Sequence, residues 1–65
     1  MSVKITIPAA RKNAGLSQKD LGRICGVSES TVRNWEKGRT EPTVSEAMKI
    51  CEAVGLHYDN IIFLA

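Results

Sequence analysis

Four polar side chains share one face of a helix that the sequence predicts from Glu29 to Lys37. They combine hydrogen-bond donors and acceptors of fixed direction, which is what recognition of base edges in the DNA major groove requires. A face that contacts only water would carry more lysine and glutamate, and serine and asparagine are mediocre residues in a helix interior. The candidate base-reading residues are Glu29, Ser30, Arg33 and Asn34.

Local signals at helix starts define the elements that must position this face. Ser17 precedes Asp20 by three residues and Thr43 precedes Glu46 by three, which is the spacing of a capping box. Ser28 can cap a third helix. Together with glycines that close helices and a proline suited to a first helical position, these signals predict helices over residues 8–14, 18–25, 29–37 and 43–54.

Apolar spacing assigns a buried face to these helices. Trp35 follows Val32 by three residues on the inward side of its helix, so we interpret it as a core anchor rather than as a platform for base stacking. The other residues expected inside are Leu21, Ile24 and Cys25 in the second helix and Val44, Ala47, Cys51 and Val54 in the fourth, flanked by Met48 and Ile50.

The two ends of the chain are apolar and less regular. Residues Val3–Ile7 alternate between apolar and polar types with β-branched side chains, as strands do, whereas residues 59–64 could form a short helix that runs into an extended end. The ends can pair with each other or cover the core. Val3–Ile7 and Ile61–Leu64 are equally candidates for a dimer surface.

The second and third helices are separated only by the residues around Gly26, Val27 and Ser28, which makes a tight helix-turn-helix unit. In such a unit the second helix lies in the major groove and the first crosses the DNA backbone. Residues 1–39 hold eight of the nine basic residues and have a charge balance of +5, whereas residues 40–65 have a balance of −3. This asymmetry favours a polyanionic partner for the first half.

Composition excludes several other classes of protein. A chain of 65 residues is one domain, expected over 1–65, and has no room for a deep substrate cleft, so we expect no enzyme. Cys25 and Cys51 are interpreted as reduced core residues, and His57 has no neighbouring nucleophile. We expect no metal, cofactor or small-molecule ligand, and a cytoplasmic location without membrane contact.

Several motifs occur in a characteristic order along almost the whole chain. They are Arg11, the run GLSQ at residues 15–18, Leu21, the run GVS at 26–28, the run WEKG at 35–38 and Pro42. In these motifs residues 8–63 resemble the Xre family of Cro and lambda-repressor-like helix-turn-helix proteins. The resemblance implies an all-α, compact bundle of about five short helices, with the helix-turn-helix at about residues 17–38.

The resemblance also implies roles for single residues. Glu29, Ser30 and Asn34 match base-reading positions of the family, and Arg33 lies on the same face. Arg11 and Glu36 match a structural ion pair between the first and third helices. The residues implied to bind DNA phosphates are Gln18, Lys19, Ser28, Lys37, Arg39 and Thr40.

Two positions depart from the family pattern. Gly22 stands where alanine is common, at a place where the second helix packs closely. Glu29 stands where a neutral residue is frequent, and a carboxylate near phosphates costs affinity unless it accepts a hydrogen bond from cytosine or pairs with Arg33 one turn later. We therefore expect Glu29 to orient Arg33 toward a guanine and to read or tolerate a neighbouring cytosine.

The leading hypothesis is a sequence-specific transcriptional regulator, a phage or bacterial repressor or Cro-like protein that binds double-stranded operator DNA. A homodimer is expected, because one recognition helix reads only a few base pairs. The alternative is an antitoxin-like or adaptor module of the same fold that binds chiefly another protein. Affinity that falls steeply with salt distinguishes DNA binding from an apolar protein interface.

Overall fold

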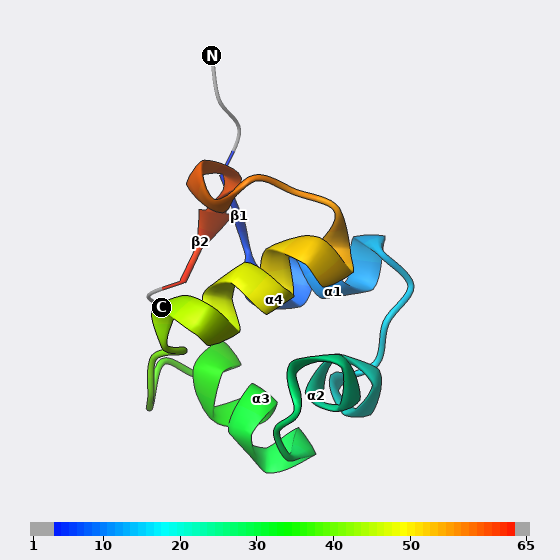
Figure 1. Ribbon diagram of the computed structural model, residues 1–65, viewed down its shortest axis with the longest axis vertical. Helices are drawn as coiled ribbons and strands as arrows, with labels where there is room; N and C mark the ends of the chain where they lie inside the picture. Colours follow the sequence, from blue (N-terminus) through cyan, green and yellow to red (C-terminus); the bar gives the residue numbers. More distant parts are fainter. Residues whose placement is uncertain (1–3, 64–65) are drawn as a thin grey trace.

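Short helices joined by tight turns make up most of residues 4–63, the part of the chain that the computed structural model describes. Figure 1 shows their arrangement. In chain order the elements are β1 (Ile5–Thr6), α1 (Ile7–Asn13), α2 (Gln18–Cys25), α3 (Glu29–Glu36), α4 (Val44–Val54), the 3-10 turn η1 (Tyr58–Asn60) and β2 (Ile61–Ile62). The expected all-α class is confirmed, with four α-helices instead of about five within these residues. The segment after α4 makes a single 3-10 turn, because the chain then extends to pair as β2.

Side-chain caps fix where the helices begin. Ser17 Oγ accepts from the backbone N–H of Asp20 at 2.9 Å, and the Asp20 carboxylate accepts from the N–H of Ser17 at 3.0 Å. Thr43 and Glu46 form the same reciprocal pair at 3.1 and 2.8 Å. The four predicted helices are confirmed to within one residue at each end, with Thr43 as the cap of α4 rather than its first residue.

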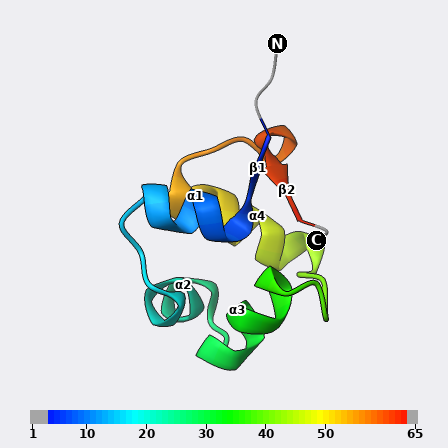
Figure 2. The ribbon, with the colours of Figure 1, turned by 180° about the vertical axis from the view of Figure 1, so that it is seen from behind.

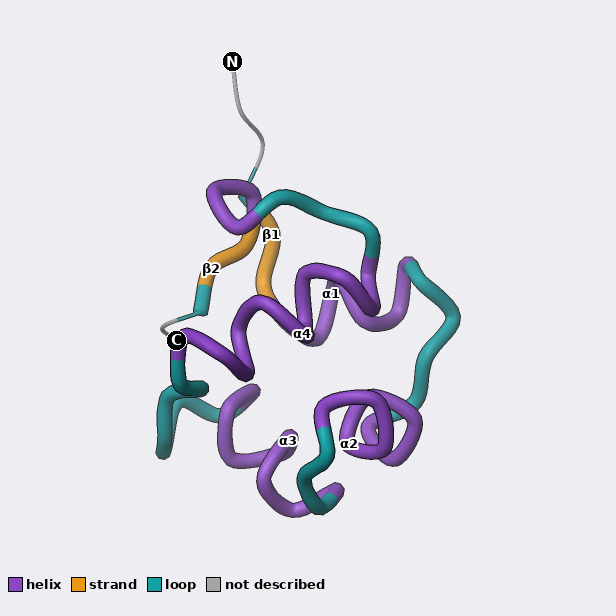
Figure 3. Tube along the Cα trace, in the orientation of Figure 1, coloured by secondary structure: helices purple, strands orange, loops and turns teal. Residues whose placement is uncertain are grey.

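The helices α2 and α3 lie together at one end of the molecule, and β1 and β2 lie on the other side of α4 from α2 (Figures 1 and 2). Figure 3 shows how short the connection between α2 and α3 is. Gly26 adopts a φ of 74° there, in the left-handed region that disfavours residues with a Cβ atom. The Val27 N–H then donates to the Gly22 carbonyl at 2.8 Å, which turns the chain directly into α3.

The core lies where α2, α3 and α4 meet α1 and the strands. Leu21, Val32 and Ile50 are fully buried, and Trp35 is only 2% exposed, which confirms it as a core anchor. Two expectations about inward faces are wrong, since Ile24 is 48% exposed and Val44 is 74% exposed.

Both errors reflect rotation of a helix about its axis. The inward face of α2 carries Gly22 beside Leu21 and Cys25, because the turn into α3 packs against that glycine, and Ile24 therefore lies outside it. The inward face of α4 is centred on Ala47, Ile50 and Cys51, so that Ile50 is central rather than flanking. Val44, as the first residue of α4, is left at the edge of that face.

The two ends of the described chain pair with each other. β1 and β2 run parallel, with Ile5 opposite Ile61 and Thr6 opposite Ile62. Ile7 and Ile61 are buried at 2% and 5% exposure, whereas Ile62 is 39% exposed. Val3 and Leu64, the outer residues of the two apolar ends, lie outside the described residues. Among residues 4–63 no helix is long and apolar enough to cross a membrane.

Candidate nucleic-acid interface

The outward face of α3 carries the four residues that the sequence nominates for base contacts. Glu29 and Ser30 are exposed, and Arg33 and Asn34 are half-buried at the next turn of the helix. The Arg33 guanidinium Nη2 lies 3.4 Å from the Glu29 carboxylate Oε2, one helical turn away. The structure therefore places the expected partner of Glu29 beside it, with both side chains open to solvent.

Ser28 is the N-cap of α3. Its Oγ accepts a hydrogen bond from the backbone N–H of Thr31 at 3.1 Å and lies 2.9 Å from the Thr31 hydroxyl. Ser28 is nevertheless exposed, so its hydroxyl lies at the surface beside the first turn of α3. A capping role and a contact with an incoming anion are compatible at such a helix start.

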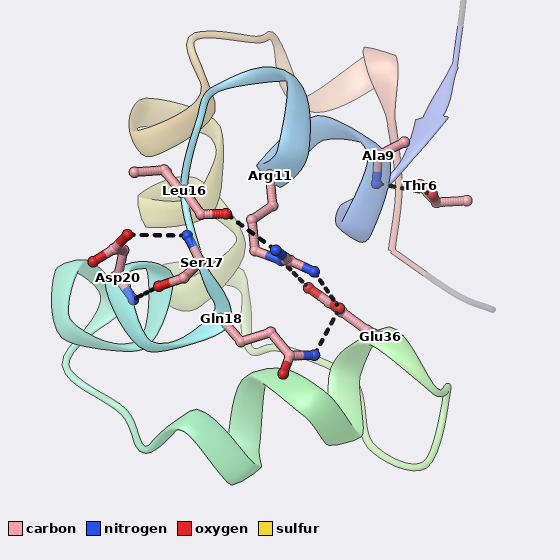
Figure 4. A network of polar contacts seen from close by, with 8 residues as sticks. All are labelled: Thr6, Ala9, Arg11, Leu16, Ser17, Gln18, Asp20 and Glu36. Atoms are coloured by element: carbon pink, nitrogen blue, oxygen red, sulfur yellow. Dashed lines mark hydrogen bonds and ion pairs between the residues drawn. The ribbon is translucent and has the colours of Figure 1, made fainter.

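Arg11, Gln18 and Glu36 meet where α1, α2 and α3 come together (Figure 4). Arg11 Nε and Nη2 donate to the two carboxylate oxygens of Glu36 at 2.7 and 3.1 Å, so that the expected ion pair is bidentate. Arg11 Nη1 donates to the carbonyl of Leu16 at 3.0 Å, just before the start of α2. Only 10% of the Arg11 side chain and 8% of the Glu36 side chain are exposed, so the pair is a buried joint between helices.

The surroundings of Glu36 favour its ionised form. Burial acts to raise the pKa of the carboxyl, but hydrogen bonds from Arg11 and Gln18 and the positive charge of Arg11 outweigh that effect. The pKa of Glu36 therefore lies below its ordinary value. A carboxylate that stays charged at this position keeps the three helices connected across the neutral pH range.

The Gln18 side chain also takes part in this contact between the helices. Sequence reasoning missed its part in the contact. Its Nε2 donates to Glu36 Oε1 at 3.0 Å, although the two residues are 18 positions apart. The sequence assigns Gln18 only to phosphate binding at the start of α2. No local signal could have indicated the second contact, because it depends on how α2 and α3 pack.

The start of α2 is an exposed, well-capped helix terminus. The capping box occupies the N–H groups of Ser17 and Asp20, and the hydrogen bonds from Ser17 hold the pKa of the Asp20 carboxyl below its ordinary value. Lys19 is exposed beside it, and Gln18 is half-buried. The helix dipole and the neighbouring lysine both favour an anion at this terminus.

The segment after α3 presents the remaining nominated residues. Lys37, Arg39 and Thr40 are all exposed. The Arg39 N–H donates to the Asn34 carbonyl at 2.9 Å, so the loop folds back on the last turn of α3. The charged groups of Lys37 and Arg39 and the hydroxyl of Thr40 therefore lie near the C-terminal end of α3, whereas Ser28 lies at its N-terminal end.

Other kinds of site find no support in residues 4–63. Cys25 and Cys51 are free and buried, and burial raises the pKa of both thiols, which makes them poor nucleophiles. Within the described residues no three His, Cys, Asp or Glu side chains are grouped as metal ligands would be. His57 is exposed at the start of η1.

The chain is similar to transcriptional regulators of the helix-turn-helix type. Residues 8–61 match a family model described as helix-turn-helix. An HTH-type transcriptional regulator of Bacillus subtilis, YgzD, is 34% identical over 62 residues, covering 95% of this chain and 94% of the relative. An HTH-type regulator of Methanothermobacter thermautotrophicus is 37% identical over 54 residues, covering 83% and 78%.

Similarity extends to a solved structure and to parts of longer proteins. The solution structure of the DNA-binding domain of the P22 C2 repressor superposes with a TM-score of 0.77 at 32% identity, covering 82% of this chain and 70% of that one. The chain spans only 6% of a glutamine–fructose-6-phosphate aminotransferase of Methanocaldococcus jannaschii, to which it is 29% identical.

Proposed function

Since the chain belongs to the helix-turn-helix family whose model it matches over residues 8–61, we propose that it represses transcription by occupying operator DNA with α3 in the major groove. It is a sequence-specific DNA-binding regulator. The proteins that it matches over most of their length are HTH-type transcriptional regulators and the DNA-binding domain of a repressor. The proposal places it in the cytoplasm, with the DNA.

The observation that carries the proposal is the exposed face of α3. Glu29, Ser30, Arg33 and Asn34 follow one side of the helix, and its buried side is fixed by Val32 and Trp35. We assign Arg33 to a guanine and Asn34 to an adenine, because their side chains match the acceptor and donor patterns of those bases. Glu29 orients Arg33 across the 3.4 Å contact and accepts from a neighbouring cytosine.

Phosphate contacts are proposed on both sides of α3. Gln18 and Lys19 at the start of α2, together with Ser28, bind one stretch of backbone, because helix starts and lysine attract phosphate. Lys37, Arg39 and Thr40, in the exposed segment after α3, bind another. These contacts would fix the register of α3 in the groove without reading sequence.

We propose that two copies bind adjacent half-sites, about 34–36 Å apart along the DNA. Of the apolar ends nominated for the dimer contact, Ile7 and Ile61 instead seal the core, and Ile62 stays 39% exposed. Val44, Met48 and Tyr58 add exposed apolar surface on α4 and η1. Among the described residues, Ile62 and these three side chains, together with Ile24 on α2, are the large apolar side chains left exposed for contact with a second copy.

Selection of bound sequences from a random DNA pool at physiological salt, followed by footprinting, tests the function. We expect enrichment of a two-fold symmetric sequence and protection of one face of the duplex. A pool that shows no enrichment contradicts the regulator proposal and favours the alternative of a protein-binding module, whose affinity for its partner would depend little on salt.

A further inference from the structure

The Gln18 side-chain amide donates a hydrogen bond to Glu36 without DNA present, and we propose that Glu36 is a positioning residue that holds this amide ready for a DNA phosphate. The inference rests on the proposed function, because it takes the phosphate contact of Gln18 from that proposal and adds a role for Glu36, which is not among the proposed DNA contacts. Glu36 would act entirely through Gln18, across the 3.0 Å hydrogen bond between Gln18 Nε2 and Glu36 Oε1.

The chemistry of the contact determines which way the amide faces. An ionised carboxylate only accepts hydrogen bonds, so the nitrogen of the Gln18 amide, and not its oxygen, must lie toward Glu36. That nitrogen carries two hydrogens. One is used by Glu36, and the other remains for a phosphate oxygen at the start of α2.

Glu36 is itself held in place by α1. Arg11 donates to both of its oxygens at 2.7 and 3.1 Å, and Oε1 therefore receives one hydrogen bond from Arg11 and one from Gln18. Arg11 also donates to the Leu16 carbonyl at 3.0 Å, which fixes the chain that leads into α2. In Figure 4 the three side chains converge from three different helices. The Gln18 side chain is thus connected, through Glu36, to Arg11 on α1.

Preorganisation and electrostatics predict opposite effects on DNA affinity when the Glu36 charge is removed. Glutamine has three rotatable side-chain bonds, and fixing them before DNA arrives removes a cost of binding. Removal of a negative charge near DNA should by itself strengthen binding to phosphates. Loss of a positioning group should weaken it instead.

Glu36→Gln provides the test, because a glutamine at this position has a single acceptor oxygen for three donors. Arg11 and Gln18 then compete for that oxygen, and we expect the Gln18 amide to become mobile. Affinity for the duplex enriched from the random pool should fall about three- to tenfold, the range that one hydrogen bond contributes. In a Gln18→Ala background the same change should alter affinity by less than about twofold.

Glu41→Gln is the matched control, since Glu41 is an exposed carboxylate in the loop after α3. It removes the same charge without touching Gln18, and we expect affinity to be unchanged or slightly stronger. Equal weakening by Glu36→Gln with and without Gln18 would overturn the positioning role. Failure of the unmodified chain to bind the duplex would contradict the proposed function itself, so the two failures are distinct.

A second measurement tests the inference even if the Glu36→Gln variant does not fold. Side-chain ¹⁵N relaxation of the unmodified, DNA-free protein reports directly on the Gln18 amide group. We expect it to be as rigid as the backbone of α2. A Gln18 amide as mobile as an exposed glutamine side chain would contradict the inference without use of any variant.

Discussion

The Glu29 and Arg33 side chains on α3 form an ion pair that contributes little to stability. The two groups lie 3.4 Å apart, with 47% of the Glu29 and 43% of the Arg33 side chain exposed, and exposed pairs one turn apart contribute only about 0.3–0.5 kcal/mol. Under the proposed function, the pair serves orientation. Glu29 would direct the long Arg33 side chain on the surface proposed to read bases.

Glu29→Gln is therefore predicted to alter the preferred operator rather than the fold. The amide cannot act as a charged acceptor for cytosine and releases Arg33, so preference at the guanine and its neighbour should relax by about 1–3 kcal/mol. Repeating the selection from random DNA measures this change. An enriched sequence identical to that of the unmodified protein would contradict the assigned role of Glu29.

The buried ion pair of Arg11 and Glu36 makes stability depend on pH in the acid range. The pKa of Glu36 lies below its ordinary value, so its stabilising contribution is present above the unfolded-state pKa of about 4.5 and is lost as pH falls through the folded-state pKa. We predict that Glu36→Gln lowers the free energy of unfolding by about 3 kcal/mol at pH 7.

The difference between the two proteins should narrow as the pH falls below about 4.5. Urea denaturation followed by circular dichroism at pH 7 and at pH 3 measures it. Asp20, whose pKa is also lowered, is present in both proteins and cancels in the comparison. A difference of the same size at both pH values would show that the charge of Glu36 is not responsible.

At the level of helices, the approach of α2 to the turn before α3 depends on Gly22. A Cβ atom at this position would lie 2.8 Å from the Val27 carbonyl oxygen and 3.3 Å from the Ser28 carbonyl. Both neighbours are backbone atoms, which cannot move aside as a side chain can. The glycine lets the helix-turn-helix close tightly, at a cost in helix propensity.

Gly22→Ala shows whether helix propensity or packing has the larger effect on stability, because the two change stability in opposite directions. Alanine improves helix propensity by about 1 kcal/mol, whereas overpacking costs about 1–3 kcal/mol. We predict a net loss of about 1 kcal/mol in the free energy of unfolding, measured by thermal or urea denaturation. An increase in stability would mean that the turn shifts freely, and would remove the packing argument for glycine here.

For the molecule as a whole, charge is divided between the two halves of the chain. The half with a balance of +5 includes α1, α2, α3 and the loop after α3 as far as Arg39, and the half with −3 includes the rest of that loop, α4, η1 and β2. Cations that bind phosphates release counterions from DNA, so each one steepens the dependence of affinity on salt. The division of charge therefore predicts that lysines in the basic half affect the salt dependence of DNA affinity and that lysines in the acidic half do not.

Lys37→Gln should reduce the slope of log K against log[salt] by about one for each bound copy, and hence by about two for a dimer. Lys49→Gln is the control, because Lys49 is an exposed lysine on α4 in the acidic half. We expect it to leave the slope unchanged. Equal effects of the two substitutions would contradict the proposed orientation on DNA, and a change of one for Lys37→Gln would indicate a single bound copy.

Much of the fold follows from local sequence. Capping boxes at Ser17 and Thr43, the cap at Ser28 and the turn at Gly26 place three helices to within one residue, since these signals involve atoms only a few positions apart. The outward, polar face of α3 follows from helical spacing in the same way. The helix-turn-helix and its candidate base-reading surface were therefore determined by the sequence alone.

Tertiary structure decided which atoms meet across the chain. Gln18 reaches Glu36 across 18 positions, and Arg11 reaches it across 25. β1 pairs with β2 from opposite ends of the chain, and the rotation of α2 and α4 leaves Ile24 and Val44 outside the core. The physical reason is that helical spacing defines a broad apolar face, and only close packing against neighbouring elements selects the side chains that are buried.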